Sequence, residues 1–369
     1  MGKLHEVSET DLDAIEIGAA ILGTGGGGNP YIGKLRCRLQ LQQGRRIKVI
    51  PIDELSDDAL VVSLGGIGAP VVGVEKIEQG EECLRAVRAL EDNLGCKVDA
   101  LISSEIGGAN SMEPMLTAAQ AAIPVVDGDG MGRAFPEMQM CTWSIYGHQS
   151  TPSAMADEKG NIVIIKNTRD EVWVETLARA NVVAMGAAAG IAMAPMKGSY
   201  VKKVAIKNTI TQALSLGNSV LKAQHNNTDP IAAVLTHEDG RLLMTGKIVD
   251  LERHLKGGFA VGHIFLQGFG DFSNDKGQID IQNEFLVFHR NNQVEICVPD
   301  LIVVLDVDTG LPITTEMLRY GQRVAVLALP CDDLLRTPEA LKVVGPEAFG
   351  YPDIIFTPMP SSKNKKEKK

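Results

Sequence analysis

Apolar residues recur at helical spacing near the start of the chain, and a run of glycines follows them. Between Ser8 and Leu22 the hydrophobic positions lie three or four residues apart, which predicts an amphipathic helix with Ser8 as its N-cap. The run Gly23–Gly28 ends this helix with five glycines in six residues. Pro30 then predicts the first turn of a second helix, because proline lacks the N–H that this position leaves unpaired.

The next part of the chain alternates between strand and helix patterns. Short runs rich in valine and isoleucine predict strands at residues 46–52, 59–64, 99–103 and 123–126. Helical spacing lies between them, at residues 75–94 and 110–122. Strands that alternate with helices indicate an α/β domain with a mostly parallel sheet covered by helices.

Extended segments dominate the second half of the chain. Residues 182–189 predict a strand, and most segments between residues 232 and 329 look extended, with turn residues between them. We therefore expect a β-rich C-terminal α+β domain. The predicted organisation is an α/β domain over residues 1–165, the β-rich domain over residues 166–360 and a disordered basic tail over residues 361–369.

Composition and charge narrow the function classes. The chain has 36 basic and 46 acidic residues among 369, a net charge of −10, which argues against nucleic acid as a partner. Its six cysteines form no CxxC pair, and its start lacks the apolar run of a signal peptide. The longest apolar stretch, residues 182–195, is short for a membrane span. We expect a cytoplasmic protein that binds a small-molecule substrate and no membrane, and whose glycine-rich, aliphatic composition suits a homo-oligomer.

Three polar or glycine-rich loops follow predicted strands of the first domain. They are Gly65-Gly66, Ser104–Gly108 and Asp127–Gly130. Ligands of open α/β sheets collect outside the carboxyl ends of the strands. We therefore expect these loops to lie side by side and to form one site.

The glycine run after the first helix is a candidate binding loop. Gly25, Gly26 and Gly27 can present backbone N–H groups to an anion, such as a substrate carboxylate, at the start of a helix. The run is not a Rossmann fingerprint, since it follows a helix, and it is not a P-loop, since no Gly-Lys-Ser/Thr follows. A tight turn between two closely packed helices is the alternative interpretation.

Glu105 and Asn110 form the second candidate. Glu105 comes directly after a predicted strand, and Asn110 stands at the start of the next helix. A carboxylate in this place can act as a general base or as a metal ligand. Its alternative role is a salt bridge or a hydrogen bond within the loop.

Asp127, Asp129 and Arg133 form the third candidate. In an extended backbone Asp127 and Asp129 point the same way, which suits an acid–base pair or a hard metal ion. Arg133 can neutralise these acids or bind a substrate carboxylate with two hydrogen bonds. The alternative is an Asx-rich turn that Arg133 holds in place.

Histidines add weaker metal candidates. No HxH, HxxxH or HExxH pair occurs, so no zincin-type site is predicted. His148 lies shortly after the acidic cluster, whereas His263 lies within a predicted strand, where a structural role is the more common one. A divalent metal such as zinc, held by Asp127, Asp129 and one of these histidines, would lower the pKa of a bound water.

Taken together, these motifs resemble those of the S-methyl thiohydantoin desulfurase family. The matching segments are Gly23–Pro30, Ser104–Asn110, Pro124–Glu137, Val298–Ile302, Asp308–Gly310 and Gly345–Gly350. The resemblance covers nearly the whole chain and implies an N-terminal α/β domain followed by a C-terminal domain. It also implies hydrolysis of a methylthio-substituted imidazolone ring to a hydantoin, with loss of methanethiol.

The residues and the resemblance together predict a hydrolase that acts on a five-membered C–N ring. Glu105, Asp127 or Asp129 would activate the water. Asn110 would contact a ring carbonyl, and Arg133 or the glycine amides would hold a substrate carboxylate. The alternative function rests on the hydantoinase and oxoprolinase genes that accompany this family, and it is a non-catalytic subunit that binds such a partner enzyme.

Overall fold

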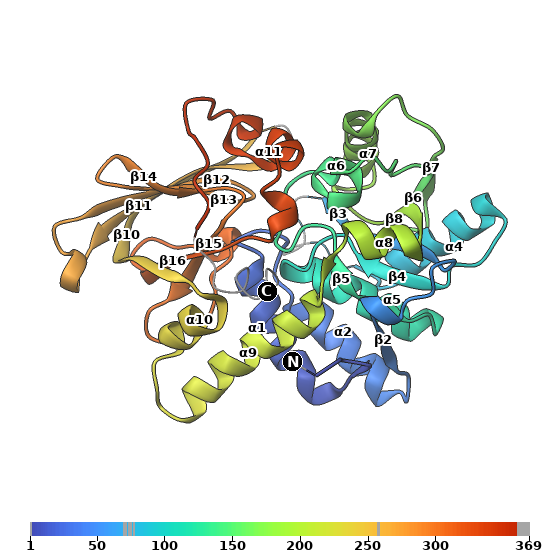
Figure 1. The fold of residues 1–369 in the computed structure, drawn as a ribbon, viewed down its shortest axis with the longest axis horizontal. Helices are drawn as coiled ribbons and strands as arrows, with labels where there is room; N and C mark the ends of the chain where they lie inside the picture. Colours follow the sequence, from blue (N-terminus) through green and yellow to red (C-terminus); the bar gives the residue numbers. More distant parts are fainter. Residues whose placement is uncertain (1, 69–71, 73–75, 77, 257–258, 360–369) are drawn as a thin grey trace, which may run out of the picture.

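Two β-sheets stand side by side in the computed structural model of this chain (Figure 1). The structure describes residues 2–68, 72, 76, 78–256 and 259–359. One sheet has nine strands and comes mainly from the first half of the chain, whereas the other has seven strands and lies in the second half. The predicted fold class, an α/β sheet followed by a β-rich region, is confirmed. The expected basic tail, residues 361–369, lies outside the described residues.

The nine-stranded sheet has a parallel centre. Its strands are β1 (Glu6–Val7), β2 (Ile47–Pro51), β3 (Leu60–Gly68), β4 (Ala100–Ser103), β5 (Val125–Asp129), β6 (Ser153–Ala156), β7 (Ile162–Ile165), β8 (Ala188–Lys197) and β9 (Ile206–Lys207). Strands β2, β5, β4 and β3 lie in that order and pair in parallel. Antiparallel β1 extends one side, antiparallel β8, β6 and β7 extend the other, and β9 pairs with β5. Every residue of β4 and β5 is buried, which explains the apolar runs that predicted these two strands.

Helices pack around this sheet, and two of them cross unusually closely. Among the described residues up to 225, the helices are α1 (Leu12–Leu22), α2 (Tyr31–Gln42), α4 (Glu82–Leu94), α5 (Met112–Ala121), α6 (Thr142–Ile145), α7 (Glu171–Ala184), α8 (Gly198–Val204) and α9 (Thr209–His225). A Cβ on Gly18 of α1 would lie 1.9 Å from the carbonyl oxygen of Ala213, and one on Gly217 of α9 would lie 1.8 Å from that of Ala14. These two glycines therefore set the distance between α1 and α9.

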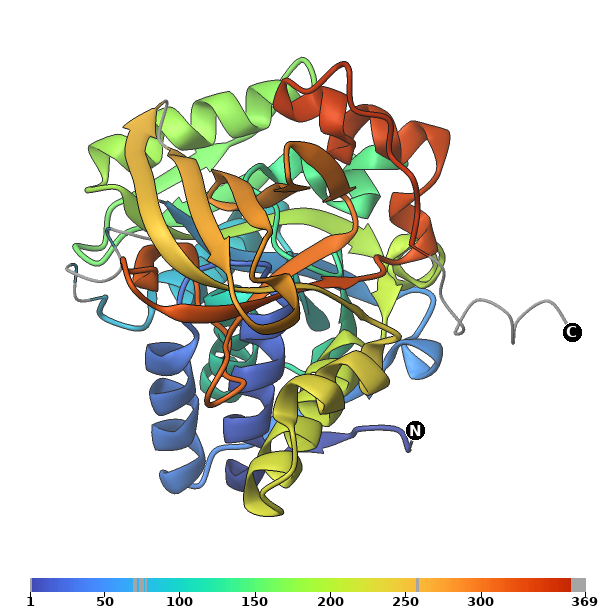
Figure 2. The ribbon, with the colours of Figure 1, turned by 90° about the vertical axis from the view of Figure 1, so that its left-hand side faces the viewer.

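The second sheet is antiparallel throughout. Its strands are β10 (Arg241–Lys256), β11 (Phe259–Gly268), β12 (Lys276–Gln282), β13 (Glu284–Arg290), β14 (Gln293–Cys297), β15 (Leu301–Asp306) and β16 (Arg323–Leu329). They lie in the order β14-β13-β12-β11-β10-β16-β15. Figure 2 looks at the molecule from the side of this sheet, whose strands cross in front of the rest. Its apolar side chains, Phe285 and Phe288 among them, form a core of their own.

Short helical segments complete the fold. The α-helices of the second half are α10 (Pro230–Glu238) and α11 (Pro338–Val344). The 3₁₀ helices are η1 (Glu9–Asp11), η2 (Ile52–Glu54), η3 (Gly108–Ser111), η4 (Met138–Met140), η5 (Gly270–Phe272), η6 (Thr315–Met317), η7 (Asp333–Leu335) and η8 (Pro346–Phe349). Within the described ranges, the search for a helix that is both long and apolar enough to span a bilayer finds none.

Two expected elements differ from the structure. The strand expected at residues 182–189 is wrong, because α7 continues to Ala184 and β8 begins only at Ala188. A continuous apolar run does not separate a buried helix from a buried strand. Gly65-Gly66, expected as a loop, lies inside β3, where Gly66 pairs with Gly190 of β8.

The expected boundary near residue 165 does not coincide with the edge of either sheet. Strands β8 and β9 lie beyond it, yet both belong to the nine-stranded sheet. That sheet therefore extends to Lys207, and the second sheet begins at Arg241.

Candidate active site

A cleft of about 550 Å³ is lined by residues from both halves of the chain. Its lining includes the end of the glycine run and the loop after β4 from the first half, and part of β8 and residues of β13 and η6 from the second half. The three segments expected to lie side by side do so, although one of them, Gly65-Gly66, belongs to strand β3. The backbone N–H of Gly130 donates to the carbonyl oxygen of Ser104 at 3.1 Å, and that of Gly66 donates to Oδ1 of Asn110 at 2.6 Å.

Glu105 lies on the wall of this cleft, directly after β4. Only 6 % of the residue is exposed. Nδ2 of Asn110 donates to Oε1 at 2.6 Å, and the backbone N–H of Phe135 donates to Oε2 at 3.0 Å. Burial raises the pKa of Glu105 to about 8, although these two hydrogen bonds oppose the shift. With this pKa the carboxyl of Glu105 is mostly protonated at neutral pH.

Asn110, in η3, lines the cleft with an amide that the protein already engages. Its Oδ1 accepts the N–H of Gly66, and its Nδ2 donates to Glu105 and, at 3.3 Å, to the carbonyl oxygen of Gly66. The structure thus places the amide on Glu105 and β3, and the expected contact with a ring carbonyl stays a prediction.

The glycines of the run 23–28 have two roles: some pack against β13, and others line the cleft. A Cβ on Gly25 would lie 2.5 Å from the ring of Phe285, and one on Gly26 would lie 2.0 Å from Oε1 of Glu284. Gly25 and Gly26 therefore pack directly against β13, and a side chain at either position would push Phe285 or Glu284 out of place. Gly27, at a φ of +71°, lines the cleft and is the one of the three that a ligand in the cleft can reach.

Arg133 is fully buried and is not among the residues that line the cleft. Nη1 donates to the carbonyl oxygens of Pro299 and Asp300, both at 3.0 Å, and Nη2 donates to Oγ1 of Thr24 at 2.8 Å. Its guanidinium also lies over the ring of Phe135, 4.6 Å from the ring centre. Arg133 thereby ties the glycine run to the C-terminal half, and its hydrogen bonds leave no donor for the expected substrate carboxylate.

Asp127 and Asp129 hold backbone segments and do not line the cleft. Asp127 accepts the N–H groups of Ile210 and Thr211 in the first turn of α9, at 2.9 and 3.2 Å. Asp129 accepts three backbone N–H groups of the neighbouring loops, including that of Ile106 at 2.8 Å. Burial raises the pKa of both, that of Asp129 to about 7. The structure thus gives the two carboxylates separate partners, and it does not bring them together as one acid–base pair.

His148 and His263 are also absent from the cleft wall. The ring of His148 packs on Tyr200, 5.2 Å between centres, and His263 of β11 pairs with Asp280 at 2.8 Å. Over the ranges that the structure describes, no three His, Cys, Asp or Glu side chains are grouped so that they could hold a metal ion. A divalent metal remains a prediction.

Two acidic residues that the sequence did not single out line the cleft from the C-terminal half. Glu284 opens β13 and Glu316 lies in η6, and they are 2 % and 7 % exposed. Burial raises the pKa of both, and the nearby charge of Glu105 adds to the effect on Glu284. One signal was available for Glu284, because the polar residues Gln282, Asn283 and Glu284 interrupt the alternating pattern directly before the apolar run 285–288.

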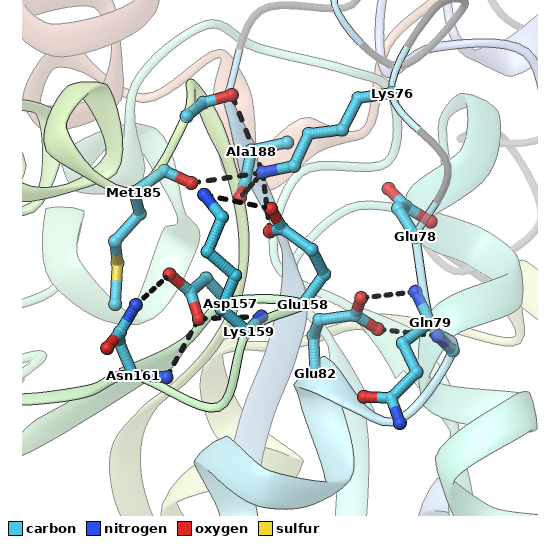
Figure 3. A network of polar contacts seen from close by, with 12 residues as sticks. Lys76, Glu78, Gln79, Glu82, Asp157, Glu158, Lys159, Asn161, Met185 and Ala188 are labelled. Atoms are coloured by element: carbon cyan, nitrogen blue, oxygen red, sulfur yellow. Dashed lines mark hydrogen bonds and ion pairs between the residues drawn. The ribbon is translucent and has the colours of Figure 1, made fainter.

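The basic residues of the cleft already have acidic or carbonyl partners. Lys76 donates to the carbonyl oxygens of Met185 and Ala188, at 3.0 and 2.9 Å, and lies 2.7 Å from Glu158 (Figure 3). Arg36 pairs with the side chain of Glu78 and also donates to the carbonyl oxygen of that residue at 3.1 Å. The protein itself therefore neutralises this end of the cleft.

Comparisons with known proteins cover the whole fold. A family model described as "S-Me-THD-like, N-terminal domain" matches residues 10–167, and one described as "S-Me-THD-like, C-terminal domain" matches residues 169–359. The crystal structure of a protein from Chromobacterium violaceum is similar, with a TM-score of 0.77 and 24 % sequence identity over 96 % of this chain and 99 % of that chain. This likeness shows a shared fold. The search of curated proteins gives no match.

Proposed function

We propose that this chain, which belongs to the S-methyl thiohydantoin desulfurase family, hydrolyses S-methyl thiohydantoins or closely related hydantoin-type rings. In this reaction water replaces the methylthio group on the ring carbon between the two nitrogens, and methanethiol leaves. The family name supports the substrate class. The arrangement of Glu105 supports the chemistry.

The single observation that carries the proposal is a buried carboxyl on a cleft wall. Glu105 is 6 % exposed, lies against the cleft and has a pKa raised by burial to about 8. A general acid–base group works best when its pKa lies near the working pH. An ordinary glutamic acid, with a pKa near 4.5, would be deprotonated at neutral pH and could not donate a proton.

The proton of Glu105 can serve each step in turn. The carboxyl first donates it to the ring nitrogen that is double-bonded to the carbon bearing sulfur, which makes that carbon more electrophilic. The carboxylate then takes a proton from water as the water oxygen bonds to this carbon. The reprotonated carboxyl next donates to sulfur, the C–S bond breaks, and the hydroxyl proton returns to Glu105 as the carbonyl forms. One water is consumed, one methanethiol is released, and Glu105 ends protonated as it began.

The surroundings of Glu105 suit this cycle. Asn110 and the backbone N–H of Phe135 hold one carboxyl oxygen each, so the group keeps its orientation while it gains and loses the proton. Both hydrogen bonds also stabilise the carboxylate that forms during the reaction, which keeps proton transfer reversible.

The substitution Glu105→Gln tests this role. With purified protein and an S-methyl thiohydantoin, release of methanethiol is followed with a thiol reagent. We expect turnover to fall by about 10²- to 10⁴-fold, the usual contribution of a general acid–base group. Glu339→Gln, on the exposed surface of α11, is the matched control and should retain activity. Full activity of Glu105→Gln would contradict the assignment.

The wild-type protein tests the proposed function itself. Methanethiol release by the isolated chain argues against the alternative, a non-catalytic subunit of a hydantoinase- or oxoprolinase-type enzyme. No release from any S-methyl thiohydantoin, with activity appearing only in a complex, would favour that alternative. Metal analysis of the same preparation tests the expectation of zinc.

A further inference from the structure

The helix α7 turns apolar residues outward as well as inward. Its inner side buries Val174, Ala178 and Val182 in the core of the first sheet. Its outer side consists of seven exposed residues without any charge: Val172, Trp173, Thr176, Leu177, Ala180, Val183 and Ala184. A helix at a protein surface normally presents charged and polar side chains to water, whereas a helix that is apolar all round is covered on both sides. The outer side of α7 therefore has the composition of a covered surface.

The exposed patch on this side is large. Its bulky side chains are between 38 and 62 % exposed, and they are Val172, Trp173, Leu177 and Val183 of α7 together with Ile162 and Ile164 of β7. Strand β7 contacts α7, and both lie at the end of the molecule away from the second sheet (Figure 1). Half-exposed side chains in this number amount to several hundred Å² of apolar surface, the size that marks an interaction site. The centre of a dimer interface is a patch of this kind, inside a total of about 800 Å² per partner.

The edge of the sheet beside α7 is also unprotected. Among the described strands, β7 is the last on its side of the nine-stranded sheet, and its four residues are all apolar. The opposite edge is β1, which has two residues and carries Glu6 in an ion pair with Arg46. Charge and shortness keep sheet edges from pairing with other chains, whereas an apolar edge calls for a cover. The need for a cover thus extends from α7 to β7.

The charge of the molecule favours a second copy of this chain as that cover. Each copy has a net charge of −10, so two copies repel each other over much of their surface. At the outer side of α7 they can meet without bringing like charges together. The nearest charges at the start of the helix, Arg169 and Asp170, have opposite signs and lie 3.4 Å apart. A charged partner of another kind would find no opposite charge on this patch.

The order of large and small residues along α7 suits antiparallel pairing with itself. A two-fold axis beside Ala178 places each outward residue opposite a different one of the second copy: Val172 opposite Ala184, Trp173 opposite Val183 and Thr176 opposite Ala180. Each of these pairs joins a larger side chain to a smaller one, and the smallest pair lies nearest the axis. The hydroxyl of Thr176 already donates to the carbonyl oxygen of Val172 at 2.8 Å, so covering it leaves no donor unpaired.

We propose that this chain forms a two-fold symmetric homodimer through the outer side of α7, with the two helices antiparallel and β7 at the margin of the contact. Each copy contributes the same patch, and the apolar side chains that water now surrounds become buried. The proposal does not depend on the proposed function, because it concerns the side of α7 that faces away from the sheet.

The mass of the protein in solution tests the proposal. Sedimentation velocity at micromolar concentration should give twice the chain mass of 39.5 kDa for the wild type. Thr176→Arg places like charges beside the axis, so we expect the dissociation constant to rise about 100-fold or more. Leu255→Arg, at a residue of β10 that is 64 % exposed, is the matched control and should stay dimeric. A monomeric wild type, or a dimer that persists in Thr176→Arg, would overturn the proposal.

A second variant separates α7 from another exposed apolar helix. Leu39 of α2 is 51 % exposed, so Leu39→Arg probes the outer side of that helix in the same way. This variant should remain dimeric. Dissociation of Leu39→Arg together with an unchanged Thr176→Arg dimer would place the contact on α2 and overturn the assignment to α7.

A disulfide tests the antiparallel arrangement. In the double variant Thr176→Cys/Ala180→Cys the new thiols of one copy should face those of the other closely enough to be joined. Mild oxidation should therefore yield a covalent dimer on a non-reducing gel, and a reductant should return it to single chains. The wild type, in which Cys96 is the exposed cysteine of the described residues, controls for other cross-links. Absence of the covalent dimer, while sedimentation still shows a dimer, would contradict this arrangement.

Discussion

Nδ2 of Asn110 lies 2.6 Å from Oε1 of Glu105, and this amide is the link between the candidate catalytic carboxyl and the central sheet. The same side chain accepts the N–H of Gly66 in β3 at 2.6 Å. Orientation of Glu105 therefore depends on a residue that need not touch the substrate. Asn110 therefore acts as a positioning residue for Glu105, and its removal should change both the rate and its pH dependence.

We predict that Asn110→Ala lowers kcat about tenfold and raises the pKa of Glu105 further. The hydrogen bond from Asn110 lowers this pKa in the native protein, so its loss shifts the group away from the carboxylate. The pH–rate profile measures both effects, and the alkaline limb should move to higher pH. A lower rate without movement of that limb would indicate a general loss of structure.

The activity of the wild-type protein should depend on the protonated form of Glu105. Because its pKa is about 8, kcat/KM should stay level near neutral pH and fall about tenfold per pH unit well above pH 8. Initial rates between pH 6 and 10 check this expectation. A profile that rises with pH through 8 would show that the carboxylate is the form that begins the reaction.

The same group predicts how stability changes with pH. Between pH 4.5 and 8 the native protein keeps the proton on Glu105, whereas the unfolded chain releases it. The native state binds more protons in this range, so Glu105 makes the protein less stable as the pH rises. Glu105→Gln should therefore gain stability relative to wild type from pH 5 to pH 8, measured by urea unfolding. A constant difference across this range would contradict the raised pKa.

Arg133 should be far more important for stability than an exposed arginine. Its guanidinium joins Thr24 to the carbonyl oxygens of Pro299 and Asp300, and removal leaves these buried acceptors without donors. We expect Arg133→Met to cost about 3 kcal/mol or more of the free energy of unfolding. Arg169→Met, at a side chain that is 85 % exposed, is the control and should cost little. Similar unfolding midpoints for the two variants would contradict this role.

Asp280 should stabilise the second sheet above pH 4. Burial alone would raise its pKa, but hydrogen bonds from His289, Gln278 and His263 outweigh burial and lower it to about 2. A lowered pKa gives stability that is present above the unfolded value of 3.8 and is lost as the pH falls toward 2. The difference corresponds to about 2 kcal/mol.

The variant Asp280→Asn measures this contribution. It should be less stable than wild type at pH 7 and nearly equal to it at pH 2, in unfolding experiments at both pH values. Asp271→Asn, on an exposed turn, serves as the control. A deficit of equal size at pH 2 and pH 7 would mean that shape, and not charge, accounts for the loss.

The sequence predicts the centre of the first sheet well because its signal is local. Buried parallel strands such as β4 and β5 are short apolar runs, and the loops after them must meet at one edge of the sheet. The same local pattern predicts Glu105 as a candidate site residue, because it directly follows β4. The sequence does not predict that β8 belongs to the first sheet, since β8 pairs with β3, which lies far away along the chain.

The sequence predicts the part of the cleft wall around Glu105, but not the part that the C-terminal region contributes. The spacing of Asp127 and Asp129 is that of an acidic pair. In the structure, however, the carboxylate of Asp127 accepts backbone N–H groups from the first turn of α9, a contact between distant residues that no local sequence motif predicts. Glu284 and Glu316 reach the cleft through contacts of β13 and η6 with the glycine run. Asn283, at a φ of +60°, makes the turn that separates β12 from β13. Because no glycine or proline marks this turn, the sequence pattern predicts a single strand over residues 278–288.

Because both halves of the chain line the cleft, the cleft is complete only after most of the chain has been synthesised. During synthesis the ribosome delivers Glu105 long before Glu284 and Glu316, so the emerging first sheet presents an open half of the wall to water. The carboxyl of Glu105 then keeps the acidity of a hydrated side chain, because the segments that help to bury it do not yet exist. If Glu105 acts as proposed, we expect no activity from a chain that ends before β13 and η6, because these segments complete the cleft.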